Sequence, residues 1–434
     1  MLKVLVVGLT ILCFAKASEI TLSNALRGAL NNNESIKALE HQKRASELRA
    51  KSASRLSLPR LKLEESISHG NMPSFFLVSK LNQGEISPQD FSPSALREPD
   101  PRSNFETKLT LEVPIWLGGK TQAIAKASKH ELSANLLEIE RKTQLILKET
   151  YQAYVNAASA KEAIKVAQQG LKLAEEHLRL SETLHKTGMA LLSDTLVAKT
   201  QVFKAEENLQ RAKREYALAS QALFNLTGLK GEVSSLERCE ELQIERLRRS
   251  VLQRQDITAL REKAKAIEQS YKAELSEILP QFYGFAQLSH SSKSAPLANG
   301  KSSYTLGLNF SMNFEIGQAT LLRSRALIEE KRSTELTIQA LSKQALLELE
   351  KAIAEYENAL DALRLAKKRV EASEEALRIL ELRYKNGLGR IVDLLEAKTE
   401  LDKARLEEVL ALRECHIAFS NALFSAGLMR EVLR

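Results

Sequence analysis

The sequence contains an internal duplication: one pattern of residues recurs in its two halves. From Gly118 to Gly228, a second copy follows at a constant offset of 199 residues, without a gap, and ends at Gly427. Upstream the offset is 221, so the first copy carries a 22-residue insertion between about residues 69 and 105. Self-similarity at a fixed offset predicts repeated structural units. We expect one repeat over about 20–230, a second over 242–430, and a linker around 231–241.

Proline placement predicts where helices can run. All nine prolines lie in two windows, 59–114 and 280–296. A proline inside a helix costs about 3 kcal/mol, so proline-free spans can be continuous helix. A composition of 27% charged and only 5% aromatic residues is typical of long helices. We expect helices over 119–186, 192–226, 318–385 and 391–424, the longer ones about 100 Å long. Such helices must pack side by side as coiled-coil-like hairpins.

The two proline windows carry a period of two, which is typical of strands. Apolar residues alternate with small or polar ones over 105–113 and 304–314, and more weakly over 61–69 and 281–290. Strands of about ten residues can cross a bilayer when tilted. Four strands cannot close a barrel, and lipid does not tolerate open edges. Several chains must therefore share one barrel, with eight strands from two copies or twelve from three.

The N-terminus and the cysteines indicate an exported chain. Lys3, an apolar run over 4–14 and Ala15-Lys16-Ala17 predict a signal peptide over residues 1–17. Lipidation of Cys13 is not favoured, because the preceding Leu12 is larger than a lipobox allows. Cys239 and Cys415 are few and far apart in sequence, so we interpret them as packing residues or free thiols.

Three stretches resemble the TolC-like outer-membrane efflux protein family. They run from Ile20-Thr21-Leu22 to Asn33, over 114–120, and from Tyr384-Lys385-Asn386-Gly387 to Ala397. The resemblance implies a mainly α fold with a small β part: a trimer with a 12-stranded transmembrane β-barrel and an α-helical barrel tunnel in the periplasm. It also implies an outer-membrane location. The implied partners are outer-membrane lipid, a periplasmic adaptor (membrane fusion) protein and an inner-membrane transporter of RND or ABC type.

The resemblance also implies a gate at the tips of the helical hairpins. The candidate gate residues are Asp194, Tyr384, Arg390, Asp393 and Glu396, and Arg390 stands one residue away from the family position. Threefold symmetry would bring three copies of Asp393 and Glu396 around one axis, where like charges raise each other's pKa and attract cations. The alternative is that Asp194 and Asp393 only cap their helices, and that Tyr384 is packing.

Glycines and prolines mark the expected turns. Gly188 and Gly387 are predicted to turn the chain at the hairpin tips. Pro59, Pro280, Gly118 and Gly317 are predicted to turn it between barrel and tunnel. The insertion over 70–104, rich in Pro, Ser and Asn, is expected to be an extracellular loop covering the mouth.

Other functions find little support in the sequence. Gly119-Lys120-Thr121 resembles the end of a P-loop, but Pro114 occupies the position of the required glycine. The histidines form no metal-binding pair, and His69 and His290 lie at strand ends. No catalytic signature is present, so we expect neither an enzyme nor a cofactor. The sequence contains no block of basic residues that would indicate nucleic-acid binding. A coiled-coil scaffold without a pore would leave the strands unexplained. A periplasmic adaptor would have a single helical hairpin and no full duplication.

Overall fold

A computed structural model describes residues 19–433. The predicted signal peptide and Cys13 lie outside this range. The chain forms two compact units. We call the first, from the described parts of 1–43, 136–259 and 338–434, the helical unit. The second, from 44–135 and 260–337, is the strand unit.

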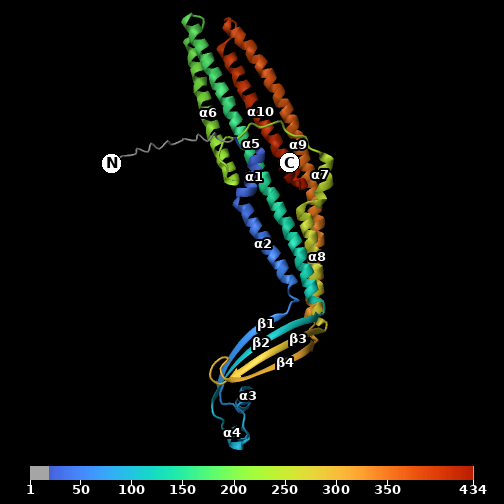
Figure 1. The fold of residues 1–434 in the computed structure, drawn as a ribbon. Coiled ribbons are helices and arrows are strands. Elements are labelled where there is room, and N and C mark those ends of the chain that lie inside the picture. Colours follow the sequence, from blue (N-terminus) through green and yellow to red (C-terminus); the bar gives the residue numbers. More distant parts are fainter. Residues whose placement is uncertain (1–18, 434) are drawn as a thin grey trace, which may run out of the picture. The chain divides into compact units, whose positions relative to one another are not determined.

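Two long hairpins dominate the helical unit (Figure 1). The first is made by α5 (Lys120–Lys186) and α6 (Leu192–Thr227), and the second by α9 (Ala319–Lys385) and α10 (Ile391–Ala426). Both long helices have 67 residues and both returning helices have 36. The prediction from the proline-free spans is therefore confirmed to within two residues at each end. The N-terminal parts of α5 and α9, up to residues 135 and 337, belong to the strand unit.

Shorter elements surround the hairpins of the helical unit. They are α1 (Leu22–Asn32), the start of α2 (Glu34–Ser54), α7 (Ile244–Ser250), η2 (Val251–Gln253), the start of α8 (Gln255–Leu275) and η4 (Met429–Leu433). The main core joins residues far apart in sequence, including the fully buried Leu26, Leu147, Leu223, Leu349 and Met429. This burial is what stabilises helices whose individual propensity is modest.

The segment between the repeats is fixed to the helices by a disulfide. Cys239 is bonded to Cys415 of α10, with 6.2 Å between their Cα atoms. Beside it, Tyr356 donates a hydrogen bond to the carbonyl of Glu240 (2.6 Å), and His416 donates one from Nε2 to the carbonyl of Glu237 (3.1 Å). The interpretation of both cysteines as packing residues or free thiols was wrong, because sequence separation does not limit spatial proximity.

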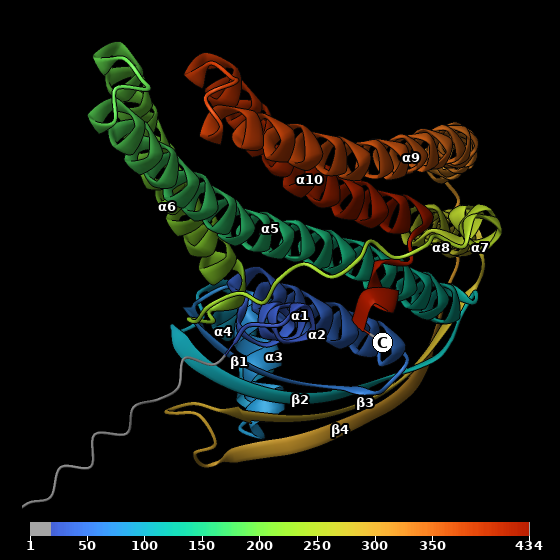
Figure 2. The same ribbon diagram turned by 90° about the horizontal axis from the view of Figure 1, so that it is seen from above.

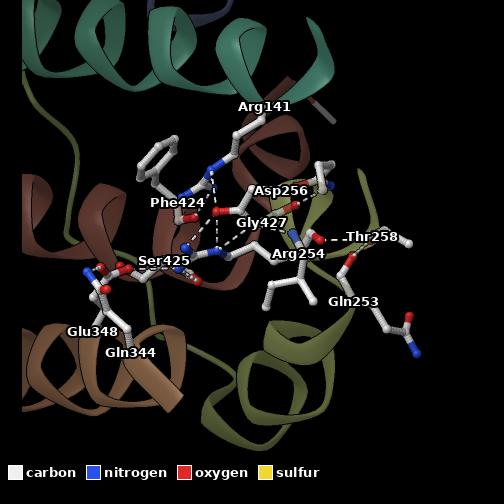
Figure 3. A network of polar contacts seen from close by, with 12 residues as sticks. Arg141, Gln253, Arg254, Asp256, Thr258, Gln344, Glu348, Phe424, Ser425 and Gly427 are labelled. Carbon is white, nitrogen blue, oxygen red and sulfur yellow. Dashed lines mark hydrogen bonds and ion pairs between the residues drawn. The ribbon is translucent and has the colours of Figure 1, made fainter. Parts of the chain in front are cut away.

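A buried arginine network holds four elements of the helical unit together (Figure 3). Arg254, 3% exposed, donates hydrogen bonds to Asp256 (2.8 Å) and to Glu348 of α9 (2.8 Å). Arg141 of α5 donates to the carbonyl of Phe424 (2.7 Å) and lies over its ring, 3.6 Å from the centroid. The carbonyl of Phe424 also accepts the N–H of Gly427 (3.0 Å), so Arg141 adds a charge-assisted bond at the C-terminal end of α10, where a cation is favoured.

The strand unit contains one antiparallel sheet in the order β1-β2-β3-β4, drawn as four adjacent curved strands in Figure 2. The strands are β1 (Arg60–Gly70), β2 (Arg102–Leu117), β3 (Gln281–Ser292) and β4 (Gly300–Ser311). All four predicted strands are present, but β4 ends at Ser311 rather than at residue 314. Within the described chain, β1 and β4 each have one unpaired edge.

The two faces of the sheet differ in polarity. Register places the row Leu63, Leu109, Leu288 and Tyr304 on one face, and the row Glu64, Lys108, Ser289 and Ser303 on the other. The apolar face is strongly exposed in the single chain, with side chains 59–80% accessible at Leu61, Leu63, Ile67, Leu288, Tyr304, Leu306, Leu308 and Phe310. A water-soluble sheet would bury such a face.

The predicted turns between strands and helices lie where the chain changes element. Pro59 directly precedes β1 and Pro280 directly precedes β3. Gly118 has a φ of +60°, and a Cβ there would lie 2.8 Å from the carbonyl oxygen of Ser276. In the second repeat the left-handed residue is Gln318 (φ +52°), not Gly317. The first turn thus has the stricter requirement for glycine.

The insertion is helical rather than an irregular loop. It contains α3 (Pro73–Gln83), η1 (Pro88–Phe91) and α4 (Pro93–Arg97), all in the strand unit, as is η3 (Ser276–Ile278). Each helix of the insertion has a proline in its first turn, where a missing N–H costs nothing. Across residues 19–433, no helix combines the length and apolarity needed to cross a membrane.

Candidate functional site at the hairpin tips

Both hairpin tips turn on a left-handed glycine. Gly188 (φ +77°) follows α5 and Gly387 (φ +70°) follows α9. After each, the next N–H returns to the helix: Met189 to the carbonyl of Leu184 (2.8 Å) and Leu388 to that of Arg383 (2.9 Å). This is the glycine-dependent stop of an α-helix, and a side chain at either glycine would strain the turn.

The candidate acids Asp194 and Asp393 lie in the first turns of the returning helices. Asp194 accepts a hydrogen bond from the backbone N–H of Leu191 (3.1 Å), as the acidic N3 residue of a capping box does. Asp393 pairs with Arg390, whose Nη2 donates to Oδ1 at 2.8 Å. Arg390 therefore forms its ion pair within its own hairpin.

The Arg390–Asp393 pair changes the electrostatics expected at the tip. Within one protomer, the hydrogen bond and charge of Arg390 lower the pKa of Asp393. We expected the opposite direction for acids gathered around a threefold axis. Each copy thus brings a carboxylate that already has a cation beside it, and Glu396 supplies the second carboxylate one turn further along α10.

Tyr384 is buried at the end of α9. Its side chain is 5% exposed, and its hydroxyl makes no hydrogen bond of normal geometry. Burial raises the pKa of Tyr384, the nearby Ser181 of α5 opposes this, and Asp194 of α6 adds to it. Tyr384, on the second hairpin, therefore lies near groups of the first hairpin.

An apolar cluster holds the tip regions of the two hairpins together. From the first hairpin it receives Leu184, 7% exposed. The second hairpin supplies its remaining buried members: Leu377, Tyr384, Ile391, Leu394, Leu395 and Leu401. The contact between the hairpins is thus mainly hydrophobic in one protomer, with Tyr384 as part of it.

A buried polar group that the sequence analysis missed lies further along the same helices. His177 of α5 is 1% exposed, and its Nε2 lies 3.4 Å from Oε1 of Glu381 in α9 without hydrogen-bond geometry. Lys398 of α10, also buried, bonds to Asp402 (2.5 Å). Burial lowers the pKa of His177, while Glu381 opposes the shift. The equivalent of His177 in the second repeat is Ala376. This difference between the repeats is the one sequence signal that could have pointed to the buried histidine.

Two long helical hairpins and an amphipathic sheet with two unpaired edges are the parts of an outer-membrane channel subunit. Comparison with known proteins supports the same class of protein. The profile of the outer membrane efflux protein family matches residues 25–229 and 247–426, and the chain belongs to this family. The predicted family, its outer-membrane location and the mainly α fold with a small β part are thereby confirmed.

Individual relatives are distant in sequence, and solved structures among them share the fold. Outer membrane protein TolC of Vibrio cholerae serotype O1 is 25% identical over 166 residues, which cover 38% of this chain and 37% of that relative. VceC of Vibrio cholerae has a TM-score of 0.74 at 18% identity, covering 94% of this chain and 96% of that one. The Campylobacter jejuni CmeC outer membrane channel has a TM-score of 0.77 at 18% identity, covering 94% and 85%.

Proposed function

We propose that three copies of this chain form a passive exit duct through the outer membrane. Four strands from each copy would make a 12-stranded barrel, and the four long helices from each copy a tunnel in the periplasm. The observation that carries this proposal is the sheet: one apolar face, one polar face and two unpaired edges. Lipid on one side, water on the other and pairing between copies would satisfy all three features.

The helices support assembly from several copies. Apolar side chains remain exposed along the helical unit's α6 and α9, away from the cores of the single chain. They include Leu192, Leu196 and Phe203 of α6, and Leu347, Leu365 and Leu382 of α9. Exposed apolar residues in this number indicate surfaces that neighbouring subunits cover.

We further propose that the hairpin tips form the gate. The apolar contact of Leu184 with Tyr384 and its neighbours would keep the tips closed, and Asp194, Arg390, Asp393 and Glu396 would line the approach. Parting the hairpins would expose the cluster while leaving the helices intact. The cost of exposing it is why opening would need a partner.

The partners proposed for the duct are a periplasmic adaptor and an inner-membrane transporter of RND or ABC type. Membership of the outer membrane efflux protein family supports a tripartite efflux pump, with type I secretion as the related use. The duct itself would carry out no chemistry: cargo would enter from the pump and pass through the tunnel. Specificity would then lie in the pump.

The test is the assembly state and conductance of protein extracted from outer membranes. Native mass spectrometry in detergent should give a trimer, and the same sample should insert into planar bilayers and conduct. A monomer or dimer that never conducts would overturn the duct and favour a coiled-coil scaffold.

A further inference from the structure

The helical insertion is held rigidly on the end of its own sheet. Gln83, 5% exposed at the end of α3, places Nε2 within hydrogen-bond distance of the carbonyls of Ser103 (3.0 Å) and Ser292 (3.2 Å). Arg102, 6% exposed, bonds to Glu85 (2.7 Å) and to Gln83. The start of β2 and the end of β3 thus fix the position of α3.

The turn between β3 and β4 is equally well fixed, and it presents an exposed leucine. His290 donates from Nε2 to the carbonyl of Ala298 (2.9 Å), and Ala298 donates its N–H to the carbonyl of Ala295 (3.1 Å). Leu297, which lies between Ala295 and Ala298, is 71% exposed and has a φ of +57°. A leucine is disfavoured in this left-handed conformation, where glycine or asparagine is usual.

A second exposed apolar side chain lies at the other edge of the same end of the sheet. Met72, 66% exposed, follows the last residue of β1, Gly70, by two positions and caps α3. β1 and β4 are the two unpaired edges. Gly70 ends β1 at the same end of the sheet at which Gly300 begins β4.

Pairing between copies would bring these two side chains together. In a barrel of alternating strands, β4 of one copy runs antiparallel to β1 of the next. The start of β4 then lies beside the end of the neighbour's β1. Leu297 precedes β4 by three residues and Met72 follows β1 by two. Both residues therefore lie just beyond the two strands that would pair between the copies, a boundary that we call the seam.

We propose that Leu297 of one copy packs against Met72 at the start of α3 in the neighbouring copy. This contact continues the pairing of β4 with the neighbour's β1 beyond the strands and links the β3–β4 turn of each copy to the insertion of the next, at the outer end of the barrel. The occupant of the surface is therefore a second copy of this chain. The inference rests on the proposed trimer and adds an interface that strand pairing alone does not require.

Cross-linking tests the proximity directly. The double variant Met72→Cys, Leu297→Cys, treated with a short bis-maleimide, should give covalent trimers, and each single variant should not. Cys239 and Cys415 are held in a disulfide and do not react, and Cys13 belongs to the predicted signal peptide. If the double variant is a trimer by native mass spectrometry but does not cross-link, the contact between Leu297 and Met72 is wrong and the proposed duct is unaffected. If the wild-type protein is not a trimer, both proposals are wrong.

Replacing the leucine distinguishes the seam from an ordinary surface turn. Leu297→Gly relieves the strain of a left-handed backbone conformation. If the turn makes no contact with a neighbouring copy, the variant should therefore be as stable as the wild type or more stable. The seam predicts a fall of a few degrees in the temperature at which the trimer dissociates. Gln318→Gly is the matched control, because Gln318 has a similar φ of +52° and is also exposed. Equal behaviour of the two variants would contradict the proposal.

Discussion

Cys239, in the segment between the two repeats, is disulfide-bonded to Cys415 of α10 across 176 residues of sequence. The linker is thereby attached to the second hairpin at one point, with hydrogen bonds on either side of it. Because the bond closes a long stretch of chain, it restricts the unfolded ensemble strongly. It is also compatible with export to an oxidising compartment.

Removing this disulfide should destabilise the helical unit. Cys239→Ser, Cys415→Ser together are expected to cost about 2–5 kcal/mol, seen as a lower midpoint of thermal or denaturant unfolding. The wild type, unfolded without reductant, should show no reactive thiol among the described residues. Two thiols that label fully before reduction would show that the bond does not form.

The arginine network at the end of α10 should make stability depend on pH. Burial would raise the pKa of Asp256, but the bonds and charge of Arg254 outweigh it and hold that pKa below its usual value. A lowered carboxyl pKa contributes stability above the unfolded value of 3.8, and this contribution is lost as pH falls through the folded value. Unfolding midpoints measured between about pH 5 and pH 2 should therefore fall less in Asp256→Asn than in wild type.

Arg254 itself is expected to matter for stability. Removing Arg254 leaves the carboxylates of Asp256 and Glu348, which are 28% and 40% exposed, without their buried cation, so we expect a cost of about 1–3 kcal/mol, below that of breaking a fully buried pair. Arg254→Ala should show this loss in denaturant unfolding, and Arg249→Ala, at an exposed position on α7, should not. Equal midpoints for the two variants would mean that the network is solvated and adds little.

Tyr384 separates two explanations of the gate, a polar latch and hydrophobic packing. Among the described residues of one protomer its hydroxyl makes no hydrogen bond of normal geometry, so Tyr384→Phe should change closure by no more than about 1 kcal/mol. Tyr384→Ala empties a place in the apolar cluster and should cost about 3–5 kcal/mol. The measure is the frequency of channel openings in planar bilayers. Frequent opening in Tyr384→Phe would indicate a latch formed between copies.

Protonation of His177 should loosen the contact between the hairpins. Glu381, Lys398 and Glu176 are the charged groups that act on it, and burial lowers its pKa below 6.5. For a histidine with a lowered pKa, the stability contribution is present above the unfolded value and is lost as pH falls. Hydrogen exchange in α5 near His177 should therefore speed up on acidification. His177→Ala should remove this dependence, and His185→Ala, at an exposed histidine, should keep it.

The long helices and strands could be predicted because their signals are local. Proline-free spans ending at Gly188 and Gly387 define the hairpins to within two residues. The alternation beyond Ser311 was misleading, because β3 begins at Gln281, opposite Ser311, and leaves the next residues of β4 without a partner. The insertion's helices were missed because its prolines were interpreted as breaks, although Pro73 opens α3.

What the sequence could not show depends on three-dimensional proximity. The Cys239–Cys415 bond joins distant segments, and no spacing rule identifies such a pair. The pairing of Arg390 with Asp393 within one hairpin was not expected, although their spacing of three residues allows it. The roles of Asp194, Tyr384, Arg390, Asp393 and Glu396 in gating stay predictions, as do the exact limits of the repeats.

The gate at the tips is tested most directly by single-channel conductance in planar bilayers. Wild type is compared with an Asp393→Ala, Glu396→Ala double variant, and Glu206→Ala, Glu207→Ala at exposed positions of α6 serves as control. The duct predicts small, cation-selective openings in wild type and control, and larger, less selective ones in the tip variant. Identical conductance and selectivity in all three proteins would contradict an acidic gate at the tips.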